Sequence, residues 1–351
     1  MNLAERFLAL PPERRALAFE QAAAGRAGQA VILEKDFWVS WLLGLLFANS
    51  ELAPHLVFKG GTSLSKVFGV IDRFSEDIDL CLLPEFVGAD AAAFDALGSR
   101  GKRDAAVLDM QRLCAEKAQA VVLPLLEQTI AQRLGKAPTG QWLRYELDVD
   151  AKSPIIYFAY PTTQLGGFAY VVREVKLELG TLTDQQPTEV QPVRPLLADA
   201  FPQLFEKWNC TVTALALQRT FWEKATILHA EFHRPPESPT PDRYARHYFD
   251  MVKLLGHAQA TAFLADKAQC DRVVDWKSRV FARGWARYDL AHHGSFRLVP
   301  PRARQDALAR DYATMRPMFM SEPPSFAELM LGLAEAEHSL NKPLRAAPTA
   351  R

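Results

Sequence analysis

Two aspartates stand two residues apart near the end of the segment FKGGTSLSKVFGVIDRFSEDIDLCL, residues 58–82. Asp77-Ile78-Asp79-Leu80 alternates as a β-strand does, so both carboxylates are expected on one face and both apolar side chains on the other. Two carboxylates held so close repel each other unless a cation lies between them. Mg²⁺, with Mn²⁺ as the alternative, suits this pair because it prefers oxygen ligands and can bridge to substrate phosphates.

A glycine pair precedes the aspartates, between a short apolar run and a predicted helix. Glycines let the backbone approach a ligand closely, and a helix N-terminus offers free N–H groups to an anion. A phosphate cradle beside a carboxylate pair predicts metal-assisted phosphoryl or nucleotidyl transfer. The segment lacks the Walker A spacing, so a P-loop NTPase is disfavoured. The candidate nucleotide-binding residues are Gly60, Gly61, Thr62, Ser63, Lys66, Arg73 and Ser75.

The surrounding patterns predict a mixed α/β core between helical regions. A helix is expected over 29–48, and the helical pattern of 89–134 should kink or break just before Pro124. Strands are expected within 55–82 and over 143–149, 155–160 and 168–179, whereas 181–203 lacks periodicity and is predicted to be a linker. Helices are expected at 213–233, 243–256, 260–288, 303–320 and 325–341. The expected domains are a helical segment 1–50, an α/β core 51–205 and a helical domain 206–345.

Composition sets the broad class of the protein. Lys plus Arg and Asp plus Glu both total 41 in 351 residues, so net charge alone does not favour nucleic acid. Four dispersed cysteines argue against a zinc site or a disulfide scaffold. The first residues do not read as a signal peptide, and the apolar run 37–47 is too short to span a bilayer. A cytoplasmic protein is therefore expected.

A basic stripe is predicted in the C-terminal region. Residues 267–310 hold ten Lys or Arg and four Asp, a local net charge of +6. Arg279, Arg283 and Arg287 recur every four residues, so one helix would present them together, opposite an aromatic face. The stripe is a candidate for RNA phosphates, and a solvated cationic face is the alternative. His229 and His233 have a spacing that can hold zinc, but no third ligand is evident.

Several motifs resemble the AbiEii/AbiGii toxin family, nucleotidyltransferases of the DNA polymerase β superfamily. The matching segments are EKDFW (34–38), FKGGTSLSK (58–66), RFSEDIDL (73–80), TFWEKATIL (220–228) and RHYFDMVKL (246–254). The resemblance implies a polymerase β-like α/β (α+β) core with a mixed sheet, N-terminal helices and a C-terminal helical domain. It also implies that Lys224 touches the triphosphate and that Asp250 completes the active site. The family motif often reads Arg-Asp-x-x-Asp, whereas this chain has His247 in place of the first Asp.

Such folds usually draw a third carboxylate from a neighbouring strand, and Glu178 is the candidate because alternation places it with Lys176 and Glu174. A solvent-exposed polar face is the alternative interpretation of this pattern. By resemblance, the protein transfers a nucleotide from an NTP to an RNA, tRNA being the expected acceptor, and has a cognate antitoxin. Two other hypotheses stay open: a catalytically silent NTP-binding module, and a nucleotidyltransferase acting on protein hydroxyls.

Overall fold

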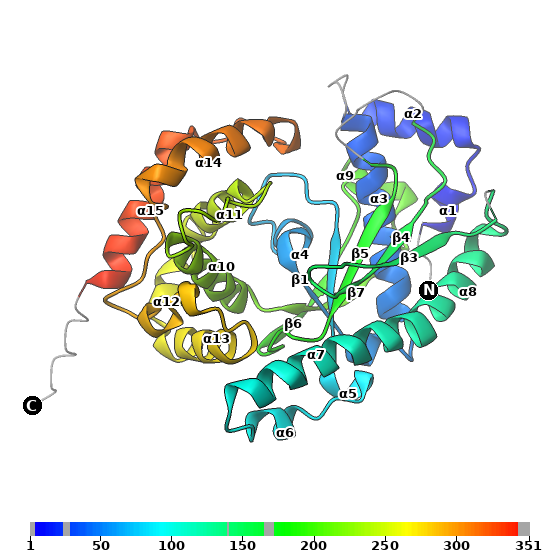
Figure 1. The fold of residues 1–351 in the computed structure, drawn as a ribbon. Coiled ribbons are helices and arrows are strands. Elements are labelled where there is room, and N and C mark those ends of the chain that lie inside the picture. The colour runs from blue at the N-terminus through cyan, green and yellow to red at the C-terminus, as the bar shows by residue number, and fades with distance from the viewer. Residues whose placement is uncertain (1–3, 24–28, 139, 165–171, 343–351) are drawn as a thin grey trace, which may run out of the picture. The chain divides into compact units, whose positions relative to one another are not determined.

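The computed structural model describes all residues except 1–3, 24–28, 139, 165–171 and 343–351. The chain forms two compact units (Figure 1). The first comprises residues 1–69 and 74–216, and the second residues 70–73 and 217–351. The N-terminal helices therefore belong to the same compact unit as the sheet.

The first unit is built on a mixed seven-stranded sheet of order β3-β4-β5-β2-β1-β7-β6. The pairs β2/β5 and β1/β7 are parallel, and the remaining neighbours are antiparallel. The strands are β1 (Leu56–Lys59), β2 (Ile78–Leu82), β3 (Leu143–Leu147), β4 (Pro154–Phe158), β5 (Val175–Gly180), β6 (Thr188–Pro192) and β7 (Thr211–Leu215).

Helices accompany this sheet in the same unit (Figure 1). They are α1 (Glu5–Leu8), α2 (Pro12–Ala22), α3 (Gln29–Ala48), α4 (Gly60–Lys66), α5 (Pro84–Val87), α6 (Ala91–Asp95), α7 (Arg100–Lys117), α8 (Leu123–Leu134) and α9 (Leu197–Ala200). The break expected before Pro124 is a π-helical turn at 118–122, after which Pro124 occupies the first turn of α8. The helical backbone continues through this turn, because the amide of Leu123 donates to the carbonyl of Ala118.

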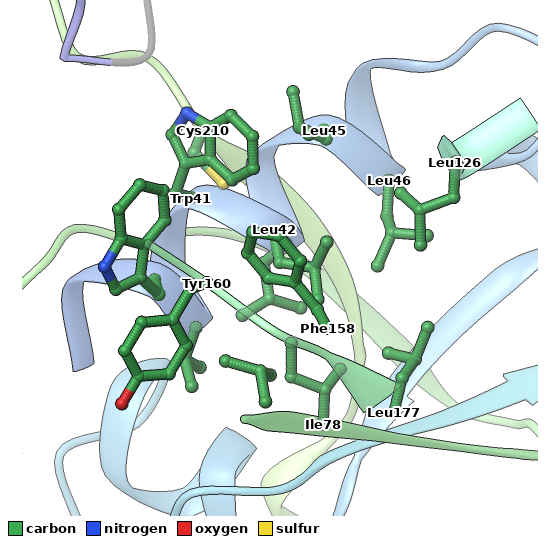
Figure 2. Close-up of a cluster of buried hydrophobic side chains, with 14 of the residues drawn as sticks. Trp41, Leu42, Leu45, Leu46, Ile78, Leu126, Phe158, Tyr160, Leu177 and Cys210 are labelled. Atoms are coloured by element: carbon green, nitrogen blue, oxygen red, sulfur yellow. The ribbon is translucent and has the colours of Figure 1, made fainter. Parts of the chain in front are cut away.

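The core of the first unit lies between one face of the sheet and α3 (Figure 2). Trp41 and Leu42 of α3 pack with Ile78 of β2, Leu177 of β5 and Phe158 of β4. Because side chains alternate along a strand, burying Ile78 and Leu177 directs their sequence neighbours to the opposite face. That opposite face carries the polar residues Lys59, Asp79, Lys176 and Glu178.

The second unit is helical in the described residues and also includes the short segment 70–73 (Figure 1). Arg73 forms an isolated antiparallel bridge with Phe319, and the amide of Met320 donates to the carbonyl of Asp72. These contacts anchor the segment within the helical unit. The helices are α10 (Leu217–Phe232), α11 (Ala245–Leu255), α12 (Ala260–Ala265), α13 (Lys267–Val280), α14 (Arg302–Thr314) and α15 (Phe326–Asn341).

Three predicted elements were wrong. The stretch 181–203 contains the edge strand β6, and residues 211–215 form β7 rather than the start of a helix. The helix expected over 260–288 is divided into α12 and α13, and α13 ends at Val280. None of the helices in the described part of the chain is long and apolar enough to cross a membrane.

Candidate active site

The turn between β1 and α4 brings a glycine against one of the two aspartates. Gly60 has a φ of +83°, a left-handed conformation that glycine adopts without strain. A β-carbon at this position would lie 1.9 Å from Oδ2 of Asp79. The carboxylate therefore occupies the space that a side chain at residue 60 would need, and the glycine turn and the carboxylate are in direct contact.

Carboxylates crowd around Asp77, which immediately precedes β2. Burial, followed by the neighbouring carboxylates of Glu76 and Asp79, raises the pKa of Asp77 to about 6, and Glu178 acts in the same direction. The ammonium group of Lys176 opposes this shift. A site in which ionised carboxylates disfavour one another is stabilised by a bound cation.

The third predicted carboxylate lies on the neighbouring strand. Glu178 of β5 is paired in register with Asp79 of β2, so both side chains leave the same face of the sheet. Glu178 also accepts a hydrogen bond from Lys176, two residues earlier on that face. No role was predicted for Lys176, although the alternation that identified Glu178 places this cation on the same face of the sheet.

The two aspartates fit a magnesium ion whose remaining ligands come from a substrate and from water. In the residues that the structure describes, no three His, Cys, Asp or Glu side chains are grouped to hold a metal ion. Mg²⁺ is usually bound by one or two carboxylates, with substrate phosphates and water completing its octahedron. Asp77 and Asp79 would supply the two carboxylates that such a site requires. Their role as ligands, like that of Glu178 as a third, stays a prediction.

Two hydroxyls predicted to bind the triphosphate are engaged inside the first unit. The buried Thr62 donates to the carbonyl oxygen of Asp77 and lies 2.9 Å from the hydroxyl of Ser75. Ser63, also buried, donates to the carbonyl of Gly60 at 2.9 Å. Thr62 thus holds the start of α4 against the segment that precedes β2, and Ser63 closes the first turn of α4. Binding of phosphate by Gly60, Gly61, Thr62 and Ser63 stays a prediction.

Two cations predicted to bind the nucleotide are paired with buried acids. Lys66 forms an ion pair with Asp36 of α3. Arg73 donates from Nε and Nη2 to the two oxygens of Asp250, at 2.7 and 2.8 Å. Nucleotide binding by either side chain stays a prediction.

Asp250 is the centre of a buried charge network in the helical unit. Its side chain is fully buried, and it accepts hydrogen bonds from Arg73 and, at 2.8 Å, from Lys224. Burial alone would raise the pKa of Asp250, but the two cations lower it well below its usual range. Both oxygens of this carboxylate are therefore occupied by cations from its own unit, and a catalytic role of Asp250 stays a prediction.

Lys224 is held by a second contact, to the histidine that departs from the family motif. Its Nζ lies 3.0 Å from Nδ1 of His247. Burial, and then the neighbouring cations, lower the pKa of His247 well below its ordinary value, so the ring is neutral. Because an ammonium group can only donate, Nδ1 must be the acceptor. His247 thus supplies Lys224 with a neutral acceptor.

We expect Asp250→Asn to lower the free energy of unfolding by about 3–5 kcal/mol, because Arg73 and Lys224 would be left buried without their counter-charge. Chemical denaturation measures this change, with Asp271→Asn, an exposed acid on α13, as the control. A variant as stable as the wild type would contradict the structural importance of the network.

The histidines His229 and His233 do not form a zinc site. His229 is fully buried, its Nε2 lies 3.0 Å from the carbonyl oxygen of Arg287, and its Nδ1 accepts from the amide of Arg297 at 3.1 Å. Both ring nitrogens are therefore bound to the backbone. Burial lowers the pKa of His229 to about 4.

This shift predicts a pH dependence of stability. The unfolded chain protonates His229 near pH 6.5, whereas the folded protein does so only near pH 4. The neutral ring makes its full contribution to the free energy of unfolding above pH 6.5. This contribution decreases by about 3 kcal/mol as the pH falls to 4. Denaturation at several pH values should show a weaker acid sensitivity in His229→Gln than in wild type. His338→Gln, at an exposed histidine, should retain the wild-type slope.

The predicted arginine stripe is absent, because α13 ends at Val280. Arg283 has extended backbone and Arg287 is left-handed, with a φ of 47°, so Arg279, Arg283 and Arg287 do not share a helix face. Arg279 pairs with Asp275 and Arg287 with Asp289. Phe281, expected on a buried face, is 41% exposed. RNA binding by these arginines stays a prediction, without a helical stripe to support it.

Two comparisons find known proteins to which this chain is similar. The profile of the family described as "Nucleotidyl transferase AbiEii toxin, Type IV TA system" matches residues 41–335. Among solved structures, the chain is similar to MenT4, a nucleotidyltransferase toxin of Mycobacterium tuberculosis H37Rv. The TM-score is 0.50 with 17% identity, over 96% of this chain and 91% of that chain, a likeness of fold. A search of curated proteins finds no match.

The family match covers both the sheet that carries Asp77 and Asp79 and the helices that carry Lys224 and Asp250. It therefore includes the glycine turn, the carboxylate pair and the buried charge network described above. The chain belongs to the AbiEii family of nucleotidyltransferase toxins of type IV toxin–antitoxin systems.

Proposed function

We propose that this nucleotidyltransferase transfers a nucleotide from an NTP to an RNA, with the 3′ end of a tRNA as the expected acceptor. The observation that carries the proposal is the contact between Gly60 and Asp79, since it joins a phosphate-approaching turn to a carboxylate of the pair. A tRNA with a blocked 3′ end cannot accept an amino acid, so translation would stop. A cognate antitoxin is the expected protein partner.

Asp77 and Asp79 would hold Mg²⁺, or Mn²⁺ in its place. When bound, the ion would neutralise charge on the triphosphate and favour in-line attack at the α-phosphorus. The backbone at Gly60 and Gly61 would bind the phosphates, because only there does the turn lack side chains. The acceptor oxygen forms a bond to the α-phosphorus, the bond to the bridging oxygen breaks, and pyrophosphate leaves.

The roles of the helical unit follow from its charge network. Asp250 would keep the ammonium group of Lys224 in a fixed orientation, and Lys224 would act on the triphosphate as the family resemblance implies. Residues 267–310 carry a sequence net charge of +6, which favours an RNA acceptor because cations attract phosphate backbones. Two of these cations, Lys277 and Arg297, are paired with Glu223 and Glu337 outside the segment.

The proposal is tested by incubating the protein with each of the four α-labelled NTPs, with total RNA or with total protein. Each reaction is run with MgCl₂, with MnCl₂ and with EDTA. We expect label in RNA of tRNA size and none with EDTA. Label only in protein would identify the hydroxyl-modifying alternative. NTP binding without label in any macromolecule would identify a silent binding module.

A further inference from the structure

Three consecutive charged residues are buried in α3, the helix that packs under the sheet. Glu34, Lys35 and Asp36 are 1%, 2% and 5% exposed. Successive side chains of an α-helix point about 100° apart, so each of the three reaches a different part of the first unit. Buried charges are costly unless they are paired and hydrogen-bonded, so each contact is a specific constraint.

Lys35 and Asp36 contact the two motifs of the candidate active site. Lys35 donates to Oε2 of Glu76 at 2.6 Å, and Glu76 directly precedes Asp77. Lys35 also donates to the carbonyl of Val172 at 2.7 Å. Asp36 pairs with Lys66 through Oδ1.

Asp36 also connects the C-terminal end of α4 to another part of the first unit. Asp36 accepts from the amide of Leu196 at 2.7 Å through its second oxygen, so both of its oxygens are used. Lys66 is the last residue of α4. At the start of α4, Thr62 donates to the carbonyl of Asp77. The contacts form a closed loop from Lys35 through the carboxylate segment and α4 back to Asp36.

Glu34 has different partners and serves as an internal comparison. It accepts from the hydroxyl of Thr162 at 2.6 Å, and from the amide and hydroxyl of Thr163 at 2.6 and 2.7 Å. These residues follow β4 and contain none of the predicted nucleotide or metal ligands. Glu34 is thus as buried as its neighbours but outside the closed loop.

We propose that Lys35 and Asp36 are positioning residues that fix the glycine turn and the carboxylate pair at the separation required by one metal-bound triphosphate. The inference rests on the proposed function. Asp36 holds Lys66 at the end of α4, and Lys35 holds Glu76 beside Asp77. Supporting contacts of this kind typically change metal affinity by about 10–100-fold when they are removed.

The test measures binding of Mn²⁺ in the presence of inorganic tripolyphosphate, the part shared by all NTPs, by electron paramagnetic resonance on the full chain. We expect Lys35→Met and Asp36→Asn each to weaken binding about 10-fold or more. The matched control Glu34→Gln should bind within about two-fold of wild type, even if its Tm falls. Lys35→Arg, which can re-form the pair with Glu76, should recover most of the affinity, and a purely structural role would not produce this pattern.

Wild-type affinity in folded Lys35→Met and Asp36→Asn would overturn the inference, as would an equal loss in Glu34→Gln. If Lys35→Met does not fold, the double variant Lys35→Met/Glu76→Gln removes both charges of the pair. It should fold and still bind weakly, and wild-type binding by it would also overturn the inference. Failure of the wild-type protein to bind would instead overturn the proposed function and this inference with it.

Discussion

Replacement of Asp77 or Asp79 by Asn should lower the rate of nucleotide transfer by at least about 10²–10³-fold, because each change removes a charged oxygen ligand from the candidate metal site. The amide has nearly the same shape as the carboxylate, so the fold should be retained. The measurement is transfer of label from an α-labelled NTP under saturating MgCl₂, with Asp150→Asn, an exposed acid of the same unit, as the control.

The free energy of unfolding should increase in Asp77→Asn, although the rate of transfer falls. Burial and adjacent carboxylates raise the pKa of Asp77 to about 6, so above that pH the ionised side chain destabilises the fold. Removing the charge should increase the free energy of unfolding by roughly 1–3 kcal/mol at pH 8 without metal. If Asp77 destabilises the fold but is needed for activity, its replacement should give a protein that is more stable and inactive. Unchanged turnover in both variants would remove the basis for the proposed site.

Gly60→Ala should reduce transfer by about 10²-fold or more. The new β-carbon would lie 1.9 Å from Oδ2 of Asp79, so the carboxylate or the turn must move, and misplaced catalytic groups cost large factors in rate. The substitution also imposes a φ of +83° on an alanine. The measurement is the rate of labelled nucleotide transfer together with Tm.

Gly88→Ala separates the two effects of the Gly60 substitution. Gly88 has a φ of +86°, yet a β-carbon there would meet nothing within 4 Å. Its alanine variant should therefore lose only the stability cost of the left-handed backbone, about 1–2 kcal/mol, and keep full activity. If both variants lost activity equally, backbone strain and not contact with Asp79 would be responsible.

Local spacing was enough to predict the elements that carry the carboxylates. The alternation of residues 77–80 and 175–180 is a short-range pattern, and burial of every second residue in β5 follows it. Helix α3 begins and ends at the predicted residues, although the charged residues 34–36 interrupt its apolar sequence. The close approach of Gly60 to Asp79 was not predicted, because it depends on the antiparallel pairing of β1 with β2.

Elements defined by long-range pairing were missed. Strand β6 lies at the edge of the sheet, and both Glu189 and Val190 are exposed, so the segment lacks alternation and owes its conformation to pairing with β7. The spacing of arginines over 279–287 predicted one helix, but a helix cannot continue past Gly284 to Arg287, whose backbone is left-handed. The regular spacing of charged residues does not show where a helix ends.

The contacts that organise the site also join distant residues. Arg73 and Asp250 are 177 residues apart, and Lys35 and Glu76 are 41 apart. From the sequence, 34–36 was a polar cluster before an apolar helix, with no indication of its partners. Only the folded chain shows that this cluster reaches both motifs of the first unit.

The most direct test of the proposed site is anomalous diffraction at the manganese edge from crystals of the full chain grown with MnCl₂ and a non-hydrolysable NTP. We predict a manganese peak within about 2.0–2.3 Å of carboxylate oxygens of both Asp77 and Asp79, with phosphate oxygens as further ligands. The triphosphate should lie against the backbone of Gly60 and Gly61. A bound triphosphate whose manganese is coordinated by neither aspartate would contradict the assignment.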